Sequence, residues 1–233
     1  MNYEEYPHSD GGSILVSFMY KVYGWMSVGL AVTAGVAYYL FRTQSFALYL
    51  RAHPGTMIWV FLLQIALIII LGMYLFRMSF TSAILLFVVF AASLGVSLSS
   101  IFFVYTMASI FSTFLVASGM FGVMCLYGYF TKTDLTRVGN LAMMGLFGLI
   151  LALFANFFLR SAMFDYVLSG IGVVVFVLLT AYETQKLKQI GQRLITDEQG
   201  RKKMAIYGAL TLYLDFINLF LFLLRFMGNR REG

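Results

Sequence analysis

Long apolar stretches, separated by short charged segments, run along almost the whole chain. Each stretch is about as long as the roughly 20 residues that an α-helix needs to cross the hydrocarbon core of a membrane. The stretches and their charged borders predict seven spans: Val22–Phe41, Met57–Phe76, Phe80–Val104, Met107–Phe130, Val138–Leu159, Phe164–Tyr182 and Ala205–Leu224. The fold class predicted is therefore an all-α polytopic membrane protein. One transmembrane domain occupies residues 22–226, between an N-terminal tail at 1–21 and a C-terminal tail at 227–233.

The third and fourth spans are read from one long uncharged region. Between Met78 and Thr131 the chain has no Asp, Glu, Lys, Arg or His. As a single helix this region would extend about 80 Å, far beyond the ~30 Å of the hydrocarbon core. We therefore expect two helices with a turn near Tyr105 and Thr106. The longest polar segment, Gln185–Lys203, is predicted to be a loop between spans.

Charge placement predicts the orientation in the membrane. The chain has a net charge of +6, and its basic residues lie between the apolar stretches, where topology and lipid head groups account for them. Nucleic-acid binding is therefore not expected. Ten Lys and Arg residues fall on the side of the N-terminus and six on the other side. The positive-inside rule then predicts a cytoplasmic N-terminus.

Sequence motifs give no support for an enzyme. HExxH and GxSxG are absent, and the two histidines, His8 and His53, lie outside the predicted spans. The single cysteine, Cys125, excludes an intrachain disulfide and a thiolate metal cluster. We expect no cofactor and no fixed metal site.

Two kinds of residue within the spans predict helix packing. Small residues spaced by four, such as Gly95 with Ser99 and Gly148 with Ala152, allow close approach of helix backbones in lipid. The amide of Gln64, within the second span, is of the type that joins helices by hydrogen bonds.

Asp215 is the most informative polar residue, because it lies near the middle of the last apolar stretch with no basic residue nearby in the sequence. A carboxylate at that depth costs several kcal/mol unless it is neutralised or paired. Thr211 and Asn218 share its helical face through their spacing. An intramembrane acid of this kind is a functional hypothesis that needs a partner.

Two residues are candidates for that partner. Glu183 lies where the sixth span leaves the hydrocarbon, on one face with Thr180, and Arg77 lies at the matching end of the second span. Two carboxylates in a dry site favour the retention of one proton, and Arg77 would compensate the remaining charge. Three simpler interpretations stay open: a solvated interfacial Glu183, Arg77 as a topology anchor, and Asp215 as a structural acid.

Three segments carry a resemblance to a known family. LYGYFTKTDL at 126–135, AYETQKLK at 181–188 and GALTLYLDFINLFLFLLR at 208–225 resemble signature stretches of the bacterial branch of the Bax inhibitor-1 family. The resemblance implies six helices packed around a central seventh, and a proton-sensitive calcium leak. It also implies that an acid on the sixth helix and one on the seventh share a proton, with an arginine on the second helix. These roles fall on Glu183, Asp215 and Arg77, with Glu183 in place of a shorter aspartate.

The function predicted is a pH-sensitive calcium leak of the bacterial inner membrane. Its partners would be protons, the lipid bilayer and calcium ions held transiently at Glu183 and Asp215. One alternative is a regulatory membrane protein that binds other membrane machinery, such as a quality-control protease. It would dock through the acidic tail with Glu4, Glu5 and Asp10, or through the basic segment Lys186–Lys203. A second alternative is a proton-coupled transporter that uses the same acids.

Overall fold

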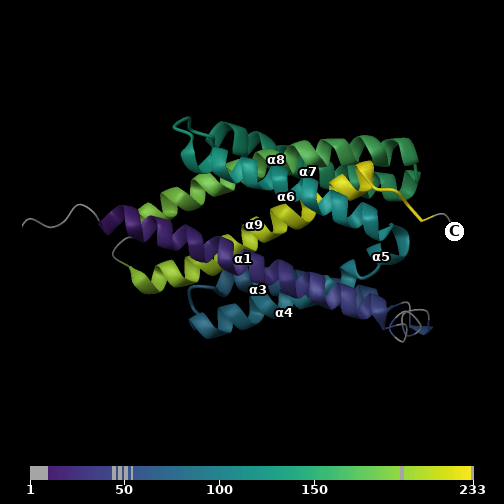
Figure 1. Cartoon of the computed structure of the whole chain (residues 1–233), viewed down its shortest axis with the longest axis horizontal. Coiled ribbons are helices and arrows are strands. Elements are labelled where there is room, and N and C mark those ends of the chain that lie inside the picture. Colours follow the sequence, from purple (N-terminus) through teal and green to yellow (C-terminus); the bar gives the residue numbers. More distant parts are fainter. Residues whose placement is uncertain are drawn as a thin grey trace, which may run out of the picture.

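The computed structural model describes residues 10–43, 46, 49, 52, 53, 55–194 and 197–231. Within this part of the chain, seven helices are long and apolar enough to cross a membrane. Figure 1 shows them as an elongated bundle in which spans that follow one another along the chain run in opposite directions. The elements are α1 (Asp10–Arg42), α3 (Thr56–Tyr74), α4 (Phe80–Leu98), α5 (Ile101–Val104), α6 (Met107–Phe130), α7 (Thr136–Leu159), α8 (Ala162–Arg193) and α9 (Glu198–Met227). The one-turn α5 continues the α4 span.

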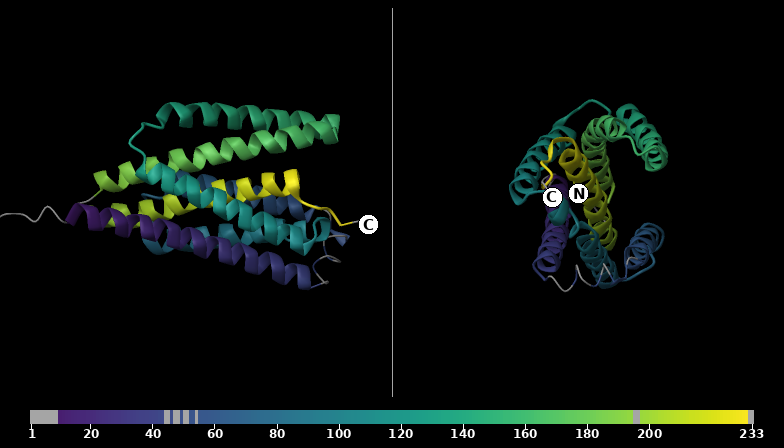
Figure 2. Two further views of the ribbon diagram at one scale, coloured as in Figure 1. Left: turned by 45° about the horizontal axis from the view of Figure 1, so that its top comes forward. Right: turned by 90° about the vertical axis from the view of Figure 1, so that its right-hand side faces the viewer.

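The last helix, α9, is the centre of the bundle, as the resemblance implies. Over its most apolar window 72% of the residues are buried, against at most 33% in any other span. Helices α1, α4, α6 and α8 pack directly against α9, whereas α3 packs mainly on α4 and α7 mainly on α8. The end-on view in Figure 2 shows α3 and α7 at the outer corners. The residues around Asp215 are therefore enclosed by protein and not by lipid.

Helix starts coincide with short polar side chains that accept hydrogen bonds from the free backbone N–H groups of the first turn. Thr106 accepts from Ser109 N at 3.2 Å, and Asp197 accepts from Gly200 N at 2.8 Å. Thr106 therefore begins α6, and the predicted turn at Tyr105 and Thr106 is confirmed.

Three helices extend further into the polar regions than the apolar stretches predict. Helix α1 begins at Asp10, well before Val22, and α8 continues to Arg193. Because α9 begins at Glu198, most of the predicted loop Gln185–Lys203 is helical. The hydropathy pattern marks only the part of a helix inside hydrocarbon. Lys, Gln, Glu and Arg are good helix formers that let the helix continue into water.

Close backbone contacts fix the packing of the helices. At Gly128 on α6, an added Cβ would collide with the carbonyl group of Ala181 on α8, so only glycine allows this approach. At Gly95 an added Cβ would lie 2.7 Å from the carbonyl oxygen of Thr33 on α1, which confirms the predicted packing role. Gly148 has open space around it, so the predicted packing role is wrong there. Gly148 lies on the outer helix α7. Its spacing from Ala152 does not show whether that face of α7 is covered.

The amide of Gln64 joins α3 to α4. Its Nε2 donates to the carbonyl oxygen of Ser93 at 2.9 Å and to the hydroxyl of Ser97 at 2.8 Å. The predicted hydrogen-bonding role of this amide is confirmed.

Candidate functional site

Asp215 lies at the contact between α9 and α8. The residue is only 7% exposed, and its Oδ2 has no hydrogen-bond partner among the described residues. The charged groups that act on it are Glu183 and Lys186, both on α8. The site is therefore a buried carboxyl group within electrostatic range of one acid and one base from the neighbouring helix.

Glu183 is held by a residue on its own helix. Its Oε1 lies 3.3 Å from Nζ of Lys186, and its side chain is 12% exposed. A separation of three residues places both side chains on one helical face. The ammonium group of Lys186 also lies 5.5 Å from the centre of the Tyr182 ring. Glu183 and Lys186 form a neutral ion pair at the edge of the buried site.

The structure brings together only part of the predicted site. The hydrogen bonds of the described residues include none between Glu183 and Asp215, and the position beside Glu183 predicted for Arg77 is occupied by Lys186. Arg77 is exposed in the turn after α3. That turn lies against the start of α9, where Lys203 Nζ donates to Phe76 O at 3.0 Å. This is about three helical turns before Asp215, because an α-helix has 3.6 residues per turn.

The polar residues predicted to support the site make hydrogen bonds within their own helices. Thr180, Thr211 and Asn218 each donate to the backbone carbonyl four residues earlier on their own helix. Side chains that bond back to the helix need no partner from elsewhere. In the described structure these three residues therefore bond to their helices and not to Asp215.

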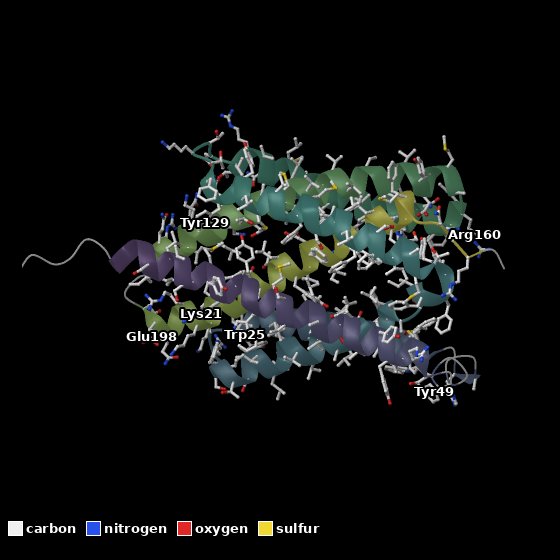
Figure 3. All side chains as sticks on the ribbon, viewed as in Figure 1. Lys21, Trp25, Tyr49, Tyr129, Arg160 and Glu198 are labelled. Carbon is white, nitrogen blue, oxygen red and sulfur yellow. The ribbon has the colours of Figure 1, made fainter. Side chains whose placement is uncertain are left out.

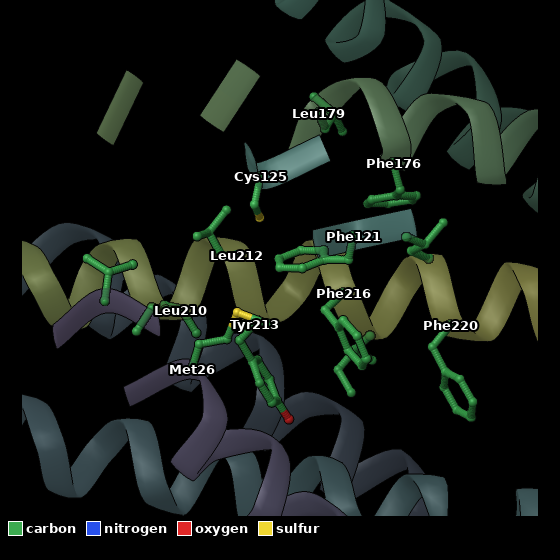
Figure 4. Close-up of a cluster of buried hydrophobic side chains, with 14 of the residues drawn as sticks. Met26, Phe121, Cys125, Phe176, Leu179, Leu210, Leu212, Tyr213, Phe216 and Phe220 are labelled. Atoms are coloured by element: carbon green, nitrogen blue, oxygen red, sulfur yellow. The ribbon is translucent and has the colours of Figure 1, made fainter. Parts of the chain in front are cut away.

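Two groups that the sequence did not single out complete the surroundings. Asp215 lies close enough to act electrostatically on Cys125 of α6, and Thr184 Oγ1 donates to the Cys125 sulfur at 3.6 Å. The Tyr23 hydroxyl of α1 lies beside this pair. Figure 4 shows Cys125 directed toward the part of α9 that carries Leu212. The spacing from Glu183 could have revealed Lys186, but no local pattern predicts contacts between α1, α6 and α9.

The opposite face of α9 carries a polar group with complete partners. The hydroxyl of Tyr213 lies 2.6 Å from Thr33 Oγ1, which also donates to Ala91 O at 2.8 Å. The rings of Phe87 and Phe90 meet the Tyr213 ring edge-on. These contacts tie α9 to α1 and α4.

Lysines of the basic segment Lys186–Lys203 are engaged within the bundle. Lys188 Nζ donates to Tyr129 O at 2.7 Å, and Lys203 Nζ donates to Phe76 O. Both carbonyls are at helix C-terminal ends, where a positive charge is favoured. These contacts leave less of the segment free for docking. Of the acidic tail, Glu4, Glu5 and the side chain of Asp10 lie outside the described residues.

The described residues contain no group of three or more His, Cys, Asp or Glu side chains placed to hold a metal ion. Transient contact with Ca²⁺ remains a prediction.

Seven membrane-length helices, one of them central and bearing a buried acid, define this chain as a polytopic membrane protein with an enclosed titratable site. The sequence model of the family described as "Inhibitor of apoptosis-promoting Bax1" matches residues 15–232. The chain belongs to this family, the Bax inhibitor-1 family.

Bacterial relatives cover nearly the whole chain. The inner membrane protein YbhL of Escherichia coli (strain K12) is 47% identical over 233 residues, covering 98% of this chain and 100% of the relative. A Rickettsia prowazekii (strain Madrid E) protein, RP147, is 44% identical and covers 92% of this chain and 90% of its own length. A Borreliella burgdorferi protein is 41% identical, with 92% and 93% covered.

Proposed function

We propose that this protein is a pH-sensitive calcium leak of the bacterial inner membrane, with its N-terminus in the cytoplasm. The observation that carries the proposal is the buried Asp215 carboxyl group, whose Oδ2 has no partner among the described residues and which lies within electrostatic range of the Glu183–Lys186 pair. Membership of the Bax inhibitor-1 family and the inner-membrane relative YbhL support it.

In the closed bundle Asp215 carries a proton. A charged carboxylate without a partner at this depth would cost several kcal/mol, whereas the neutral acid does not. The charge of Glu183 is balanced by Lys186, so the α8–α9 contact is neutral as a whole.

Loss of the Asp215 proton opens the path. The contact then holds two carboxylates and one ammonium group, and the excess negative charge favours separation of α8 from α9 and admission of water. An opening lined by carboxylate oxygens suits a hard cation such as Ca²⁺. Because two acids make a weak filter, the flux is a slow leak and not fast conduction.

Calcium flux into dye-loaded proteoliposomes tests the proposal. The parent chain is expected to leak faster as the pH rises from mildly acidic to mildly alkaline, and Asp215→Asn is expected to lose this dependence. The matched control is Asp134→Asn, because Asp134 is an exposed acid in the turn between α6 and α7. Identical pH profiles for the parent and Asp215→Asn would overturn the proposal.

A second pair of variants separates Lys186 from Arg77. Removal of the Lys186 charge withdraws the cation that favours ionised Asp215, so Lys186→Gln is expected to move the rise in flux to higher pH. Arg77→Gln is expected to leave the profile in place, because Arg77 is exposed after α3. A shift of the profile in Arg77→Gln but not in Lys186→Gln would mean that Arg77 is the residue that compensates the charge.

The regulatory alternative can be tested on the same vesicles. A protein that acts by docking through its acidic tail should lose its partner when residues 2–9, which precede α1, are deleted. A leak should keep its flux. Loss of flux after this deletion would count against the leak.

A further inference from the structure

A cationic cavity lies at the end of the bundle opposite Glu183. It has a volume of about 450 Å³, and its lining includes Arg160, Arg225 and Arg230. Asp165 is the only acidic residue in the lining. Figure 3 shows Arg160 at this end of the bundle, close to the C-terminal segment. The cavity therefore presents a net positive charge at the rim of the membrane-spanning helices.

The three arginines come from three different elements. Arg160 follows α7, Arg225 lies in the last turn of α9, and Arg230 belongs to the segment after α9. That segment is fixed by an isolated β-bridge between Arg230 and Tyr105. The salt bridges within the described residues involve other side chains, at the far end of the molecule. Three arginines thus line the cavity, and the ion pairs of the described residues join none of them to a carboxylate. The guanidinium group of Arg225 also lies 5.8 Å from the centre of the Phe222 ring.

The backbone at Arg160 gives an independent indication that its side chain is needed. Its φ is 52°, the only positive φ of a non-glycine residue in the described chain. This left-handed conformation ends α7, and glycine adopts it at no steric cost. Arginine at such a position costs backbone energy that a glycine would avoid. The chain retains a strained arginine where its charge faces the cavity.

An apolar groove of about 420 Å³ adjoins the cavity. Tyr166 lines both, and the groove follows α8 from Tyr166 and Gly170 to Val174, with Phe226 of α9 beside Tyr166. The ring of Tyr166 stacks on that of Phe226 at 4.7 Å. Gly170 also lines the groove, and a Cβ added there would be in ordinary contact with the Phe226 ring, at 3.5 Å. The polar cavity therefore adjoins an open apolar surface formed by α8 and the end of α9.

Topology does not explain these arginines. The charge count places this end on the side that carries fewer basic residues, where the positive-inside rule gives no reason to gather them. Arginine binds phosphate through parallel N–H groups, and the groove suits a hydrocarbon chain. We propose that this cavity and groove form a binding site for an anionic phospholipid, with its phosphate at Arg160, Arg225 and Arg230 and one acyl chain along Tyr166 and Gly170.

Native mass spectrometry of the purified full chain in neutral detergent tests the site, with dioleoyl phosphatidylglycerol and dioleoyl phosphatidylcholine as probes. The anionic lipid is expected to bind about tenfold more tightly, because both lipids offer a phosphate but the arginines repel the ammonium group of choline. Equal binding of the two lipids to the parent chain would overturn the proposal whatever the variants do.

Variants locate the site. Arg160→Gly is expected to lower the affinity for the anionic lipid several-fold while the chain stays folded, because glycine suits the backbone there. Arg225→Gln tests the cavity without any backbone change. The matched control is Arg42→Gln, which removes an exposed arginine at the same end but outside the cavity. A loss of affinity in the control as large as in Arg160→Gly would show that the lipid is attracted nonspecifically, and the proposed site would be wrong.

A last experiment tests whether the acyl chain contributes to binding or whether the head group binds alone. Gly170→Leu fills the groove and is expected to weaken lipid binding while soluble glycerol phosphate binds as before. If glycerol phosphate displaces the lipid at equal concentration, the acyl chain contributes nothing and the lipid assignment is wrong.

Discussion

Two polar residues only two positions apart on α9 have opposite surroundings. Tyr213 faces α1 and α4 and finds a complete set of partners around Thr33. Asp215 faces α8, and its Oδ2 has no partner among the described residues. Both residues are buried, with Tyr213 at 0% and Asp215 at 7% exposure.

The difference separates a polar group with a hydrogen-bond partner from one whose oxygen has none among the described residues. A buried polar group with its hydrogen bonds made helps to fix one packing arrangement. A buried acid with an unpaired oxygen weakens the fold, so its presence needs another reason. Tyr213 thus holds the central helix to α1 and α4, whereas Asp215 is available to change its charge.

The largest expected loss of stability comes from the face of α9 that packs against α1 and α4. Tyr213→Ala removes a ring packed between Phe87 and Phe90 and leaves a cavity. Substitutions of this kind cost about 3–5 kcal/mol. Unfolding in mixed micelles should report the loss. A cost below about 1 kcal/mol would mean that the face toward α1 and α4 is not tightly packed.

Thr33→Val should have the next largest effect. It keeps the shape of the side chain but leaves the Tyr213 hydroxyl buried without a partner, at a cost of about 1–3 kcal/mol. Tyr213→Phe in the same chain removes the orphaned hydroxyl, so the double variant should be more stable than the sum of the single costs predicts. Strict additivity would show that the two hydroxyl groups do not interact.

Asp215→Asn should change the stability by less than about 1 kcal/mol, because the native carboxyl oxygen already lacks a partner. The same unfolding assay measures it. A loss as large as that of Thr33→Val would make Asp215 a structural acid and remove the contrast between the two faces.

Much of the fold could be predicted from the chain. The stretch Met107–Phe130 is predicted with the bounds that α6 has, and the sequence resemblance implies the central place of α9. The helix ends beyond hydrocarbon could not be read, because polar residues such as those after Gln185 also form helix. Local spacing shows that Gly95 and Gly148 are small, but only the tertiary structure shows that one is covered and the other is open.

The site was predictable only where its signal is local. The depth of Asp215 follows from hydropathy, and the pairing of Glu183 with Lys186 follows from their spacing. The place of Arg77, away from the acids, does not follow from the local sequence. It depends on the packing of α3 on the outside of α4. Residues at matching ends of two spans need not meet when the helices are not neighbours.

The smallest expected effect lies at Asp134, outside the membrane. Hydrogen bonds from the side chain and backbone of Thr136 lower the pKa of the exposed Asp134 carboxyl group. Because the pKa is lower in the folded state, the turn is stabilised at pH values above the unfolded pKa of about 3.9. That stability is lost as the pH falls through the folded value. NMR titration should place its midpoint below that of the unfolded chain, and an equal midpoint would mean that the Thr136 contacts do not persist.

Infrared spectroscopy of the reconstituted protein, recorded across the pH range of the flux assay, tests the central claim most directly. A band from a protonated carboxyl group should be present while the leak is closed, should be absent in Asp215→Asn, and should disappear over the pH interval in which calcium flux rises. A spectrum without any Asp215-dependent band at the closed pH, or a band that persists unchanged while flux rises, would contradict a switch based on this proton.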